Sequence, residues 1–289
     1  MPRRQSTRRG YNIWLDNHIL PEWGSSPIVA LQARPIELWL QSLPLSAKSK
    51  LHIRGMVSIL WDYAMWRGDI PTQRNPMELV SIKGANRRLR KPRSLTSEEF
   101  HALIDALGDD VCSRNMLLLA VSFGLRISEV LGLKWKDVDF FKKTLHIERG
   151  VVKQIVDDVK SSNSAGIMVI ADEVLKDIAR WKQITQFGDA EDWVFASPAK
   201  LGRQPLSYTF VWDTLDLAAK KAGIGHVSSH TFRHTYRTWL DSVGTPVGVQ
   251  QKLMRHSDIR TTMNIYGDVV TEDVREASQK VARIAVRVV

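Results

Sequence analysis

Residues 228–235 read Ser228-Ser229-His230-Thr231-Phe232-Arg233-His234-Thr235 and contain the pair His230 and Arg233. If this segment opens a helix, the two side chains share one face, because residues three apart are neighbours on a helix surface. An imidazole and a guanidinium side by side can reach one bound anion, and a phosphate fits such a face. A His-x-x-Arg pair alone occurs by chance in many chains, so its meaning depends on the rest of the sequence.

Two other segments complete the pattern. Downstream, residues 253–266 read Leu253-Met254-Arg255-His256-Ser257-Asp258-Ile259-Arg260-Thr261-Thr262-Met263-Asn264-Ile265-Tyr266, which adds a second imidazole and a phenol. Upstream, Arg126 lies in Phe123-Gly124-Leu125-Arg126-Ile127-Ser128-Glu129. In this order the segments resemble those of the tyrosine recombinases, also called the phage integrase family. The resemblance covers the chain from about Leu95 to the end and, more loosely, the part before it.

The resemblance implies a function, a fold and partners. The expected function is that of a site-specific DNA recombinase or integrase, which cleaves and rejoins strands through a 3′-phosphotyrosyl intermediate. The expected fold is mostly α with a small antiparallel sheet (α+β), built as a helical core-binding domain followed by a mixed α/β catalytic domain. The implied partners are double-stranded DNA and further copies of the chain, as a dimer on a site and a tetramer in the synapse.

Each residue of the pattern then takes a role that its chemistry permits. Attack on a phosphodiester adds negative charge to the phosphate oxygens, and guanidinium forks can clamp that charge. The resemblance assigns the roles as follows: Tyr266 is the nucleophile, Arg126 and Arg233 clamp the phosphate, Lys160 gives a proton to the leaving oxygen, His230 takes the proton of Tyr266, His256 donates a hydrogen bond, and Glu129 orients Arg126. Side chains supply every charge, so neither a metal nor a cofactor is expected.

The family pattern is not followed everywhere. Lys160 alone reads as a surface lysine on a hairpin, but it matches the family's hairpin lysine, and Ser164 stands where the pattern has serine. Gly166 stands where a basic residue is usual, so one phosphate contact would be missing. Arg255 replaces a glycine that is usual before the histidine, which leaves the local backbone geometry open.

Charge is distributed unevenly along the 289 residues. Residues 1–94 hold 16 Lys and Arg against 6 Asp and Glu, whereas residues 95–289 hold 25 against 25, so the first third carries the entire net charge of +10. This asymmetry exceeds what solubility needs and suits a polyanion such as nucleic acid. A solvated basic face is the other interpretation.

Composition also bounds the cellular setting. Cys112 is the only cysteine, which excludes an intrachain disulfide and a cysteine-based metal cluster. No run approaches the roughly twenty apolar residues of a membrane span, and the arginine-rich start lacks the apolar stretch of a signal peptide. A cytoplasmic, nucleoid-associated protein that does not contact a membrane is expected.

Composition and periodicity divide the chain into five parts. We expect a basic flexible arm over residues 1–10, a helical core DNA-binding domain over 11–84, a basic linker over 85–94, a catalytic domain over 95–272 and a helical tail over 273–289. Trp14, Trp23, Trp39, Trp61 and Trp66 are predicted to pack the core of the helical domain. The tail has apolar residues at helical spacing with no obvious partner in its own domain, and the resemblance implies exchange in trans. A tail folded back in cis is the alternative.

The linker carries a cluster of cations around one proline. It is either a solvated tether or a strip that follows a duplex backbone, and the resemblance favours the second. The candidate DNA contacts are Arg87, Arg88, Arg90, Lys91 and Arg93.

Local signals place the elements of the catalytic domain. Thr96 and Glu99 form a capping box ahead of an apolar helix. The apolar run 116–123 ends at Gly124, which puts Arg126 just past a helix end. Strands are expected at 133–140, 144–152, 155–159 and 167–170, followed by a helix capped by Asp172 that runs through Trp181 and another from Ser207 to Lys221.

Other functions remain open at this point. Within the family, the chain could be a mobile-element integrase, a resolvase of chromosome dimers or a topoisomerase-like nicking and closing enzyme. From a different class, it could be a non-catalytic, architectural DNA-binding protein with a recombinase-like fold. The complete set of Arg, Lys, His, Arg, His and Tyr argues against the last, because binding alone needs no phenol there. Tyr11, Tyr63, Tyr208 and Tyr236 match no nucleophile position.

Overall fold

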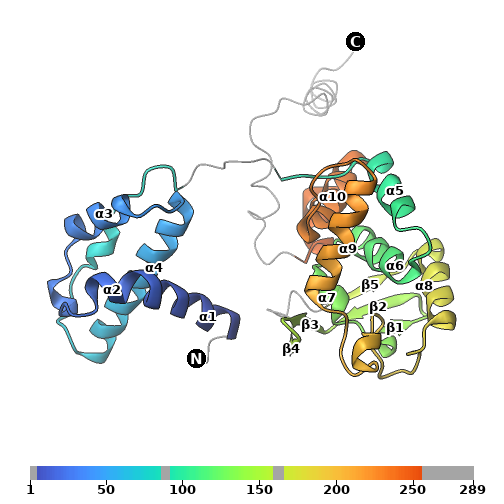
Figure 1. Cartoon of the computed structure of the whole chain (residues 1–289), viewed down its shortest axis with the longest axis horizontal. Coiled ribbons are helices and arrows are strands. Elements are labelled where there is room, and N and C mark those ends of the chain that lie inside the picture. Colours follow the sequence, from blue (N-terminus) through green and yellow to red (C-terminus); the bar gives the residue numbers. More distant parts are fainter. Residues whose placement is uncertain (1–4, 86–91, 159–165, 256–289) are drawn as a thin grey trace, which may run out of the picture. The chain divides into compact units, whose positions relative to one another are not determined.

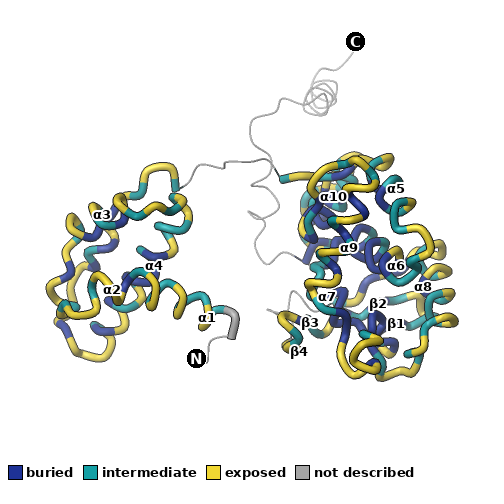
Figure 2. Tube along the Cα trace, viewed as in Figure 1, coloured by how far each residue is buried: buried dark blue, intermediate teal, exposed yellow. Residues whose placement is uncertain are grey.

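The chain folds into two compact units, Met1–Lys91 and Pro92–Val289, each with its own buried core (Figures 1 and 2). The computed structural model describes residues 5–85, 92–158 and 166–255. Both units are dominated by helices, and the second also contains small antiparallel sheets, so the predicted fold class is confirmed. The division falls within the predicted linker, between Lys91 and Pro92.

The first unit is entirely helical within residues 5–85. Its elements are α1 (Gln5–Trp14), a π-helical turn η1 (Leu15–Ile19), α2 (Leu20–Trp23), the 3-10 turn η2 (Ile28–Ala30), α3 (Ala33–Ser42), α4 (Ala47–Arg67) and the 3-10 turn η3 (Pro76–Glu78). The flexible arm predicted for residues 1–10 is wrong from residue 5 onward, because these residues form the start of α1. Tyr11 and Trp14, at the end of α1, pack against the core and anchor the helix there.

Helix α4 is the centre of this unit. The Ser46 side chain accepts a hydrogen bond from the Ser49 N–H (3.1 Å) and caps the helix, which ends at Gly68 in the left-handed region. Residues at three- and four-residue spacing, such as Ile53, Val57 and Trp61, bury one face of the helix. The tryptophan prediction is wrong at Trp66, which is 79% exposed and stacks on Tyr63.

The second unit is built around a larger core (Figure 2), and its described part contains seven helices. These are α5 (Ser97–Ala106), α6 (Val111–Ser122), α7 (Ile127–Leu131), α8 (Asp172–Ile184), α9 (Tyr208–Lys221), α10 (Ser229–Ser242) and α11 (Val247–Leu253), with 3-10 turns η4 (Trp135–Asp137) and η5 (Pro198–Lys200). The apolar helix α6 lies between α8 and α10 and makes contacts with both.

Two small antiparallel sheets lie among the described residues of this unit. One has the order β1 (Val138–Asp139), β2 (Thr144–Ile147), β5 (Gly166–Val169), and the other is the hairpin of β3 (Arg149–Val152) and β4 (Ile155–Asp158). The predicted strand 144–152 is therefore divided between two sheets. Arg149 donates to Asp137 (2.5 Å) and to the Gly132 carbonyl (3.3 Å), which holds β3 against the segment after α7. The predicted strand 133–140 is a strand only at β1, because residues 135–137 form the turn η4, in which Trp135 is buried.

Of the three helix caps predicted in the second unit, two are confirmed and one is wrong. The capping box of Thr96 and Glu99 is present at α5, and Ser207 caps α9, as predicted. Asp172 does not cap α8, because Ala171 occupies the cap position and Asp172 is the first helical residue. Its carboxylate instead pairs with Lys143 (2.7 Å). No helix in the described ranges is both long and apolar enough to cross a membrane.

Candidate active site

The turn between α6 and α7 fixes the position of Arg126. After α6 ends, Gly124 adopts φ +57°, and Arg126 is the residue immediately before α7. A Cβ atom added to Gly124 would lie 2.4 Å from Cδ1 of Tyr236, so glycine is required both by the left-handed backbone and by the packed ring. Arg126 is therefore held at the end of a rigid turn, as predicted from the sequence.

Glu129 holds both the backbone and the side chain of Arg126. Its Oε2 accepts from the Arg126 backbone N–H (3.0 Å), and its Oε1 accepts from Nη1 of Arg126 (2.7 Å). The Glu129 side chain is only 4% exposed, whereas that of Arg126 is 37% exposed. The buried carboxylate thus fixes an arginine that still reaches solvent, which is the geometry that an orienting role requires.

Arg233 lies on α10 and is almost completely buried. It donates to the Gly124 carbonyl (2.5 Å) and to the Met254 carbonyl, which joins the turn before Arg126 to the end of α11. Burial, and secondarily the charge of Arg126, lower the pKa of Arg233 to about 9. A guanidinium whose charge is disfavoured in this way would be stabilised by an anion beside it.

His230 precedes Arg233 by three residues on the same helix, at its first turn. The predicted helix is therefore present, and His230 is exposed. The amino-terminal end of a helix of this length favours anions, because its free N–H groups and its dipole point toward them.

Arg255 joins this cluster from the end of α11. The residue has φ +51°, is 8% exposed, and its Nη2 donates to Glu129 Oε2 (2.5 Å). Burial lowers the pKa of Arg255 as well. No role was predicted for this side chain, and the only signal in the sequence was its departure from the glycine of the family pattern. Arg126 and Arg255 both pair with the Glu129 carboxylate, and Arg233 lies close enough for its charge to interact with all three. In this arginine cluster three positive charges face one negative charge, and the excess suits a phosphate.

Several predicted site residues lie outside the described ranges. These are Lys160, His256 and Tyr266 of the catalytic set and Arg87, Arg88, Arg90 and Lys91 of the linker. Arg93 is described, and its Nη2 donates to Glu99 (3.0 Å) and to the Ile224 carbonyl (2.5 Å). These protein acceptors favour an anchoring role for Arg93 at the start of the second unit over a DNA contact.

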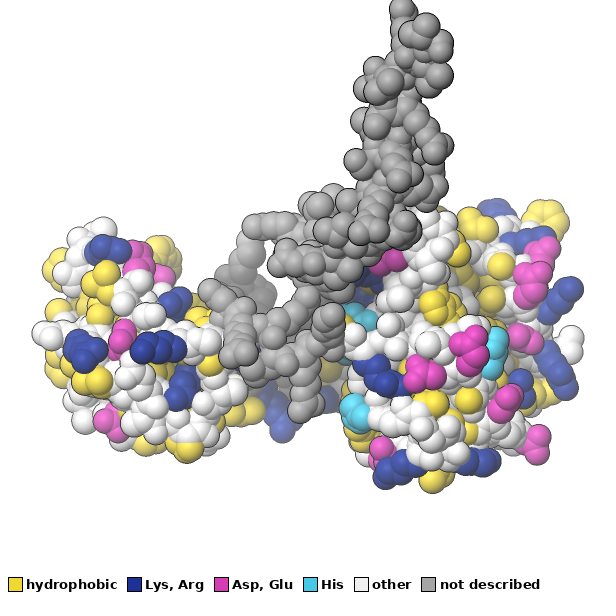
Figure 3. All heavy atoms as spheres, turned by 90° about the horizontal axis from the view of Figure 1, so that it is seen from above, with side chains coloured by type: hydrophobic (Ala, Val, Ile, Leu, Met, Phe, Trp, Pro, Cys, Tyr) yellow, Lys and Arg dark blue, Asp and Glu magenta, His cyan; other side chains and the backbone are white. Residues whose placement is uncertain are grey.

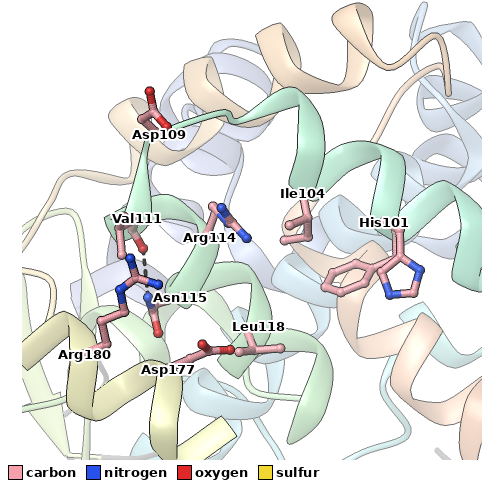
Figure 4. A pocket seen from close by; sticks show the side chains of 10 residues that line it. His101, Ile104, Asp109, Val111, Arg114, Asn115, Leu118, Asp177 and Arg180 are labelled. Carbon is pink, nitrogen blue, oxygen red and sulfur yellow. Dashed lines mark hydrogen bonds between the residues drawn. The ribbon is translucent and has the colours of Figure 1, made fainter. Parts of the chain in front are cut away.

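The pocket in Figure 4 does not qualify as the phosphate site. It lies between α5, α6 and α8 and contains none of the predicted catalytic residues. Its two arginines, Arg114 and Arg180, are matched by two acids, Asp109 and Asp177, so it lacks the excess of cations that an anion requires.

Elsewhere, charges of both signs are mixed on the visible faces of the two units (Figure 3). Within the described residues, no group of three or more His, Cys, Asp or Glu side chains is arranged to hold a metal ion. The clearest local excess of one sign that the contacts define is the arginine cluster around Glu129.

Comparison with known proteins gives matches over most of the chain. The model of the phage integrase family matches residues 93–272. The tyrosine recombinase XerA of Pyrococcus horikoshii is 26% identical over 280 residues, which cover 96% of this chain and 88% of that protein.

Solved structures share the fold. The Tn1549 transposon integrase in complex with transposon right end DNA is similar with a TM-score of 0.80 at 20% identity, covering 97% of this chain and 95% of that chain. A lambda integrase tetramer bound to a Holliday junction is similar with a TM-score of 0.70 at 20% identity, and the match covers 94% of this chain and 74% of that chain.

Proposed function

The chain belongs to the phage integrase family and is a tyrosine-type site-specific recombinase; on that premise we propose that Tyr266 cleaves DNA by attacking a phosphate held by Arg126 and Arg233. The observation that carries this proposal is the arginine cluster. In it, Glu129 Oε1 accepts from Nη1 of Arg126 (2.7 Å), and the three positive charges of Arg126, Arg233 and Arg255 exceed the single negative charge of Glu129. The attack produces a 3′-phosphotyrosyl link, which keeps the bond energy for religation to another strand.

The other groups have proposed roles in moving protons. Lys160 donates a proton to the leaving 5′ oxygen, and His230 accepts the proton of Tyr266. His256 donates a hydrogen bond to the phosphate. Arg126 and Arg233 offset the charge that develops in the transition state, and losing one such donor typically costs on the order of 10²–10³ in rate.

The proposed partner is double-stranded DNA, and the proposed assembly is a dimer on each site and a tetramer in the synapse. The lambda integrase tetramer on a Holliday junction, which shares the fold, supports this assembly. Binding to chromosomal DNA would place the protein in the cytoplasm with the nucleoid. The domain roles proposed are core binding for residues 11–84 and catalysis for residues 95–272.

The proposal is tested by covalent trapping. DNA that the protein selects from a genomic library supplies the site, and a nicked version of that site prevents religation. The wild-type chain should form a denaturation-resistant adduct with the end carrying the 3′ phosphate. A protein that binds the selected site tightly but never forms the adduct would be the non-catalytic, architectural alternative.

The linker is expected to carry part of the salt dependence of DNA binding. Replacing Arg87, Arg88, Arg90 and Lys91 with Ala should lower the slope of log affinity against log salt by about 0.9 for each phosphate that is no longer neutralised, so by about 3.6 at most. Titrations by fluorescence anisotropy at several salt concentrations measure the slope. As a control, replacing Lys142 and Lys220 should leave it unchanged, because Asp139 and Asp216 neutralise these lysines. An unchanged slope for the linker variant would rule out backbone contacts there.

We also propose that the tail, residues 273–289, docks on a neighbouring protomer. The second unit has an apolar groove between β5 and α10, lined by residues such as Val169, Trp239 and Val243, and Val243 is 74% exposed. The apolar stripe of the tail is a suitable occupant.

Truncation after Thr271 should spare binding to a single site and weaken cooperative assembly, because it removes only the segment that is exchanged between protomers. Val243→Asp should have the same effect from the side of the groove. Native gels with one-site and two-site DNA measure both properties. Full cooperativity of the truncated chain would contradict exchange of the tail.

A further inference from the structure

Arg255 occupies a backbone conformation that disfavours its own side chain. Its φ of +51° lies in the left-handed region, where a Cβ atom crowds the following carbonyl. The residue is nevertheless an arginine, and it is buried to 8% exposure. Such a strained backbone persists when surrounding contacts determine it, and it then points to a role for the residue.

The side chain of Arg255 connects Glu129 on α7 with strand β5. Its Nη2 donates to Glu129 Oε2 (2.5 Å), and its Nη1 lies 2.8 Å from the sulfur of Met168 on β5. Its Cδ lies 3.4 Å from the position that a Cβ on Gly166 would occupy, so the missing side chain at the start of β5 leaves room for the arginine. Arg255 also directly precedes His256 in the chain.

Glu129 therefore has two arginine partners with different positions. Arg126 binds Oε1 and its side chain is 37% exposed, whereas Arg255 binds Oε2 and its side chain is 6% exposed. The buried arginine fixes the plane of the carboxylate from within the protein. Arg255 also offsets part of the negative charge of Glu129. Without Arg255, that carboxylate would attract Arg126 more strongly and would compete with a bound phosphate for the Arg126 guanidinium.

We propose that Arg255 is a positioning residue for strand cleavage. It orients Glu129 so that Arg126 faces the scissile phosphate, and it ties the backbone ahead of His256 to β5. Arg255 does not touch the DNA. This inference rests on the proposed function of the arginine cluster and adds a residue that acts through Glu129.

The decisive variant is Arg255→Gly, because glycine accepts the left-handed backbone and removes only the side chain. On the nicked site, the single-turnover rate of adduct formation should fall by about 10–100-fold, since small misplacements of a catalytic group have effects up to about 10². Affinity for the same DNA should change by less than about threefold, because Arg255 makes no contact with it. Arg255→Lys keeps a charge near Glu129 and should restore part of the rate.

Two readouts separate positioning from general stability. In a double-mutant cycle, adding Arg255→Gly to Glu129→Gln should cost little beyond Glu129→Gln alone, because both act through one contact. On a site with a neutral methylphosphonate at the scissile position, the rate reduction caused by Arg255→Gly should shrink, because less charge then needs to be clamped. Arg149→Gln breaks another buried arginine–carboxylate pair, with Asp137 (2.5 Å), and any rate reduction it causes should be equal on both substrates.

The outcomes are distinguishable. A wild-type chain that forms no adduct overturns the proposed function, and the inference with it. A wild-type chain that forms the adduct while Arg255→Gly reacts at the same rate overturns the inference alone. Additive rate reductions in the cycle, together with an equal reduction on the methylphosphonate, would assign Arg255 a structural role only.

Discussion

Replacing Tyr266 with Phe is expected to eliminate the covalent protein–DNA adduct while leaving DNA affinity unchanged. The substitution removes one oxygen and little volume. Without the phenol oxygen, no other group in the proposed mechanism can form a covalent bond to the 3′ phosphate. The measurement is the adduct on a nicked site by denaturing gel, alongside equilibrium binding to the same DNA. We expect adduct below detection and a dissociation constant within about twofold of wild type, since losing a single hydroxyl changes the affinity for a whole DNA site little.

Tyr236 provides the matched control for this experiment. It is half-buried beside the arginine cluster, and its ring packs against Gly124. Burial raises the pKa of its phenol, which disfavours the phenolate that attacks phosphorus. Tyr236→Phe should therefore retain the adduct. If Tyr266→Phe still traps DNA at the wild-type level, the nucleophile is a different residue and the proposed mechanism is wrong.

Replacing Arg126 with Ala should lower the single-turnover rate of adduct formation by about 10²–10³, the usual cost of losing one preorganised charge donor. Binding of the site should weaken far less, because the contact strengthens as charge develops in the transition state. Arg126 suits this test better than Arg233. Removing Arg233 would leave the buried carbonyls of Gly124 and Met254 without their donor and would disturb folding.

Rapid-quench kinetics on the nicked site, with thermal unfolding of each variant, make this comparison. Arg126→Lys should fall between Ala and wild type, because lysine keeps the charge but lacks the bidentate fork. An Arg126→Ala variant that is fully folded and cleaves at the wild-type rate would remove Arg126 from the phosphate clamp.

Part of the site could be predicted because it depends on local sequence rules. The spacing of His230 and Arg233 follows the helix period, and α10 carries both residues. Gly124 ends one apolar helix, and this alone places Arg126 ahead of the next. The Thr96 and Glu99 box acts over three residues. Each of these signals involves residues only a few positions apart, so it can be recognised in the sequence without knowledge of the tertiary fold.

The remainder depends on contacts between distant residues. Arg255 pairs with Glu129 across 126 positions, and Arg93 reaches Ile224 across 131. The spacing of residues in the sequence does not indicate such long-range pairs. In addition, the direction of the Arg255 side chain depends on a left-handed backbone that arginine rarely adopts. The helix at residues 5–10 could not be predicted for a related reason, because its stability comes from packing of Tyr11 and Trp14 rather than from its own basic residues.

The turn at Gly124 also limits how this protein can evolve. A mutation at position 124 meets two independent obstacles, the φ of +57° and the Tyr236 ring, and a smaller residue at position 236 would remove only the second. A smaller residue at position 236 would therefore rescue such a mutant only in part, because the left-handed backbone at position 124 would still be strained.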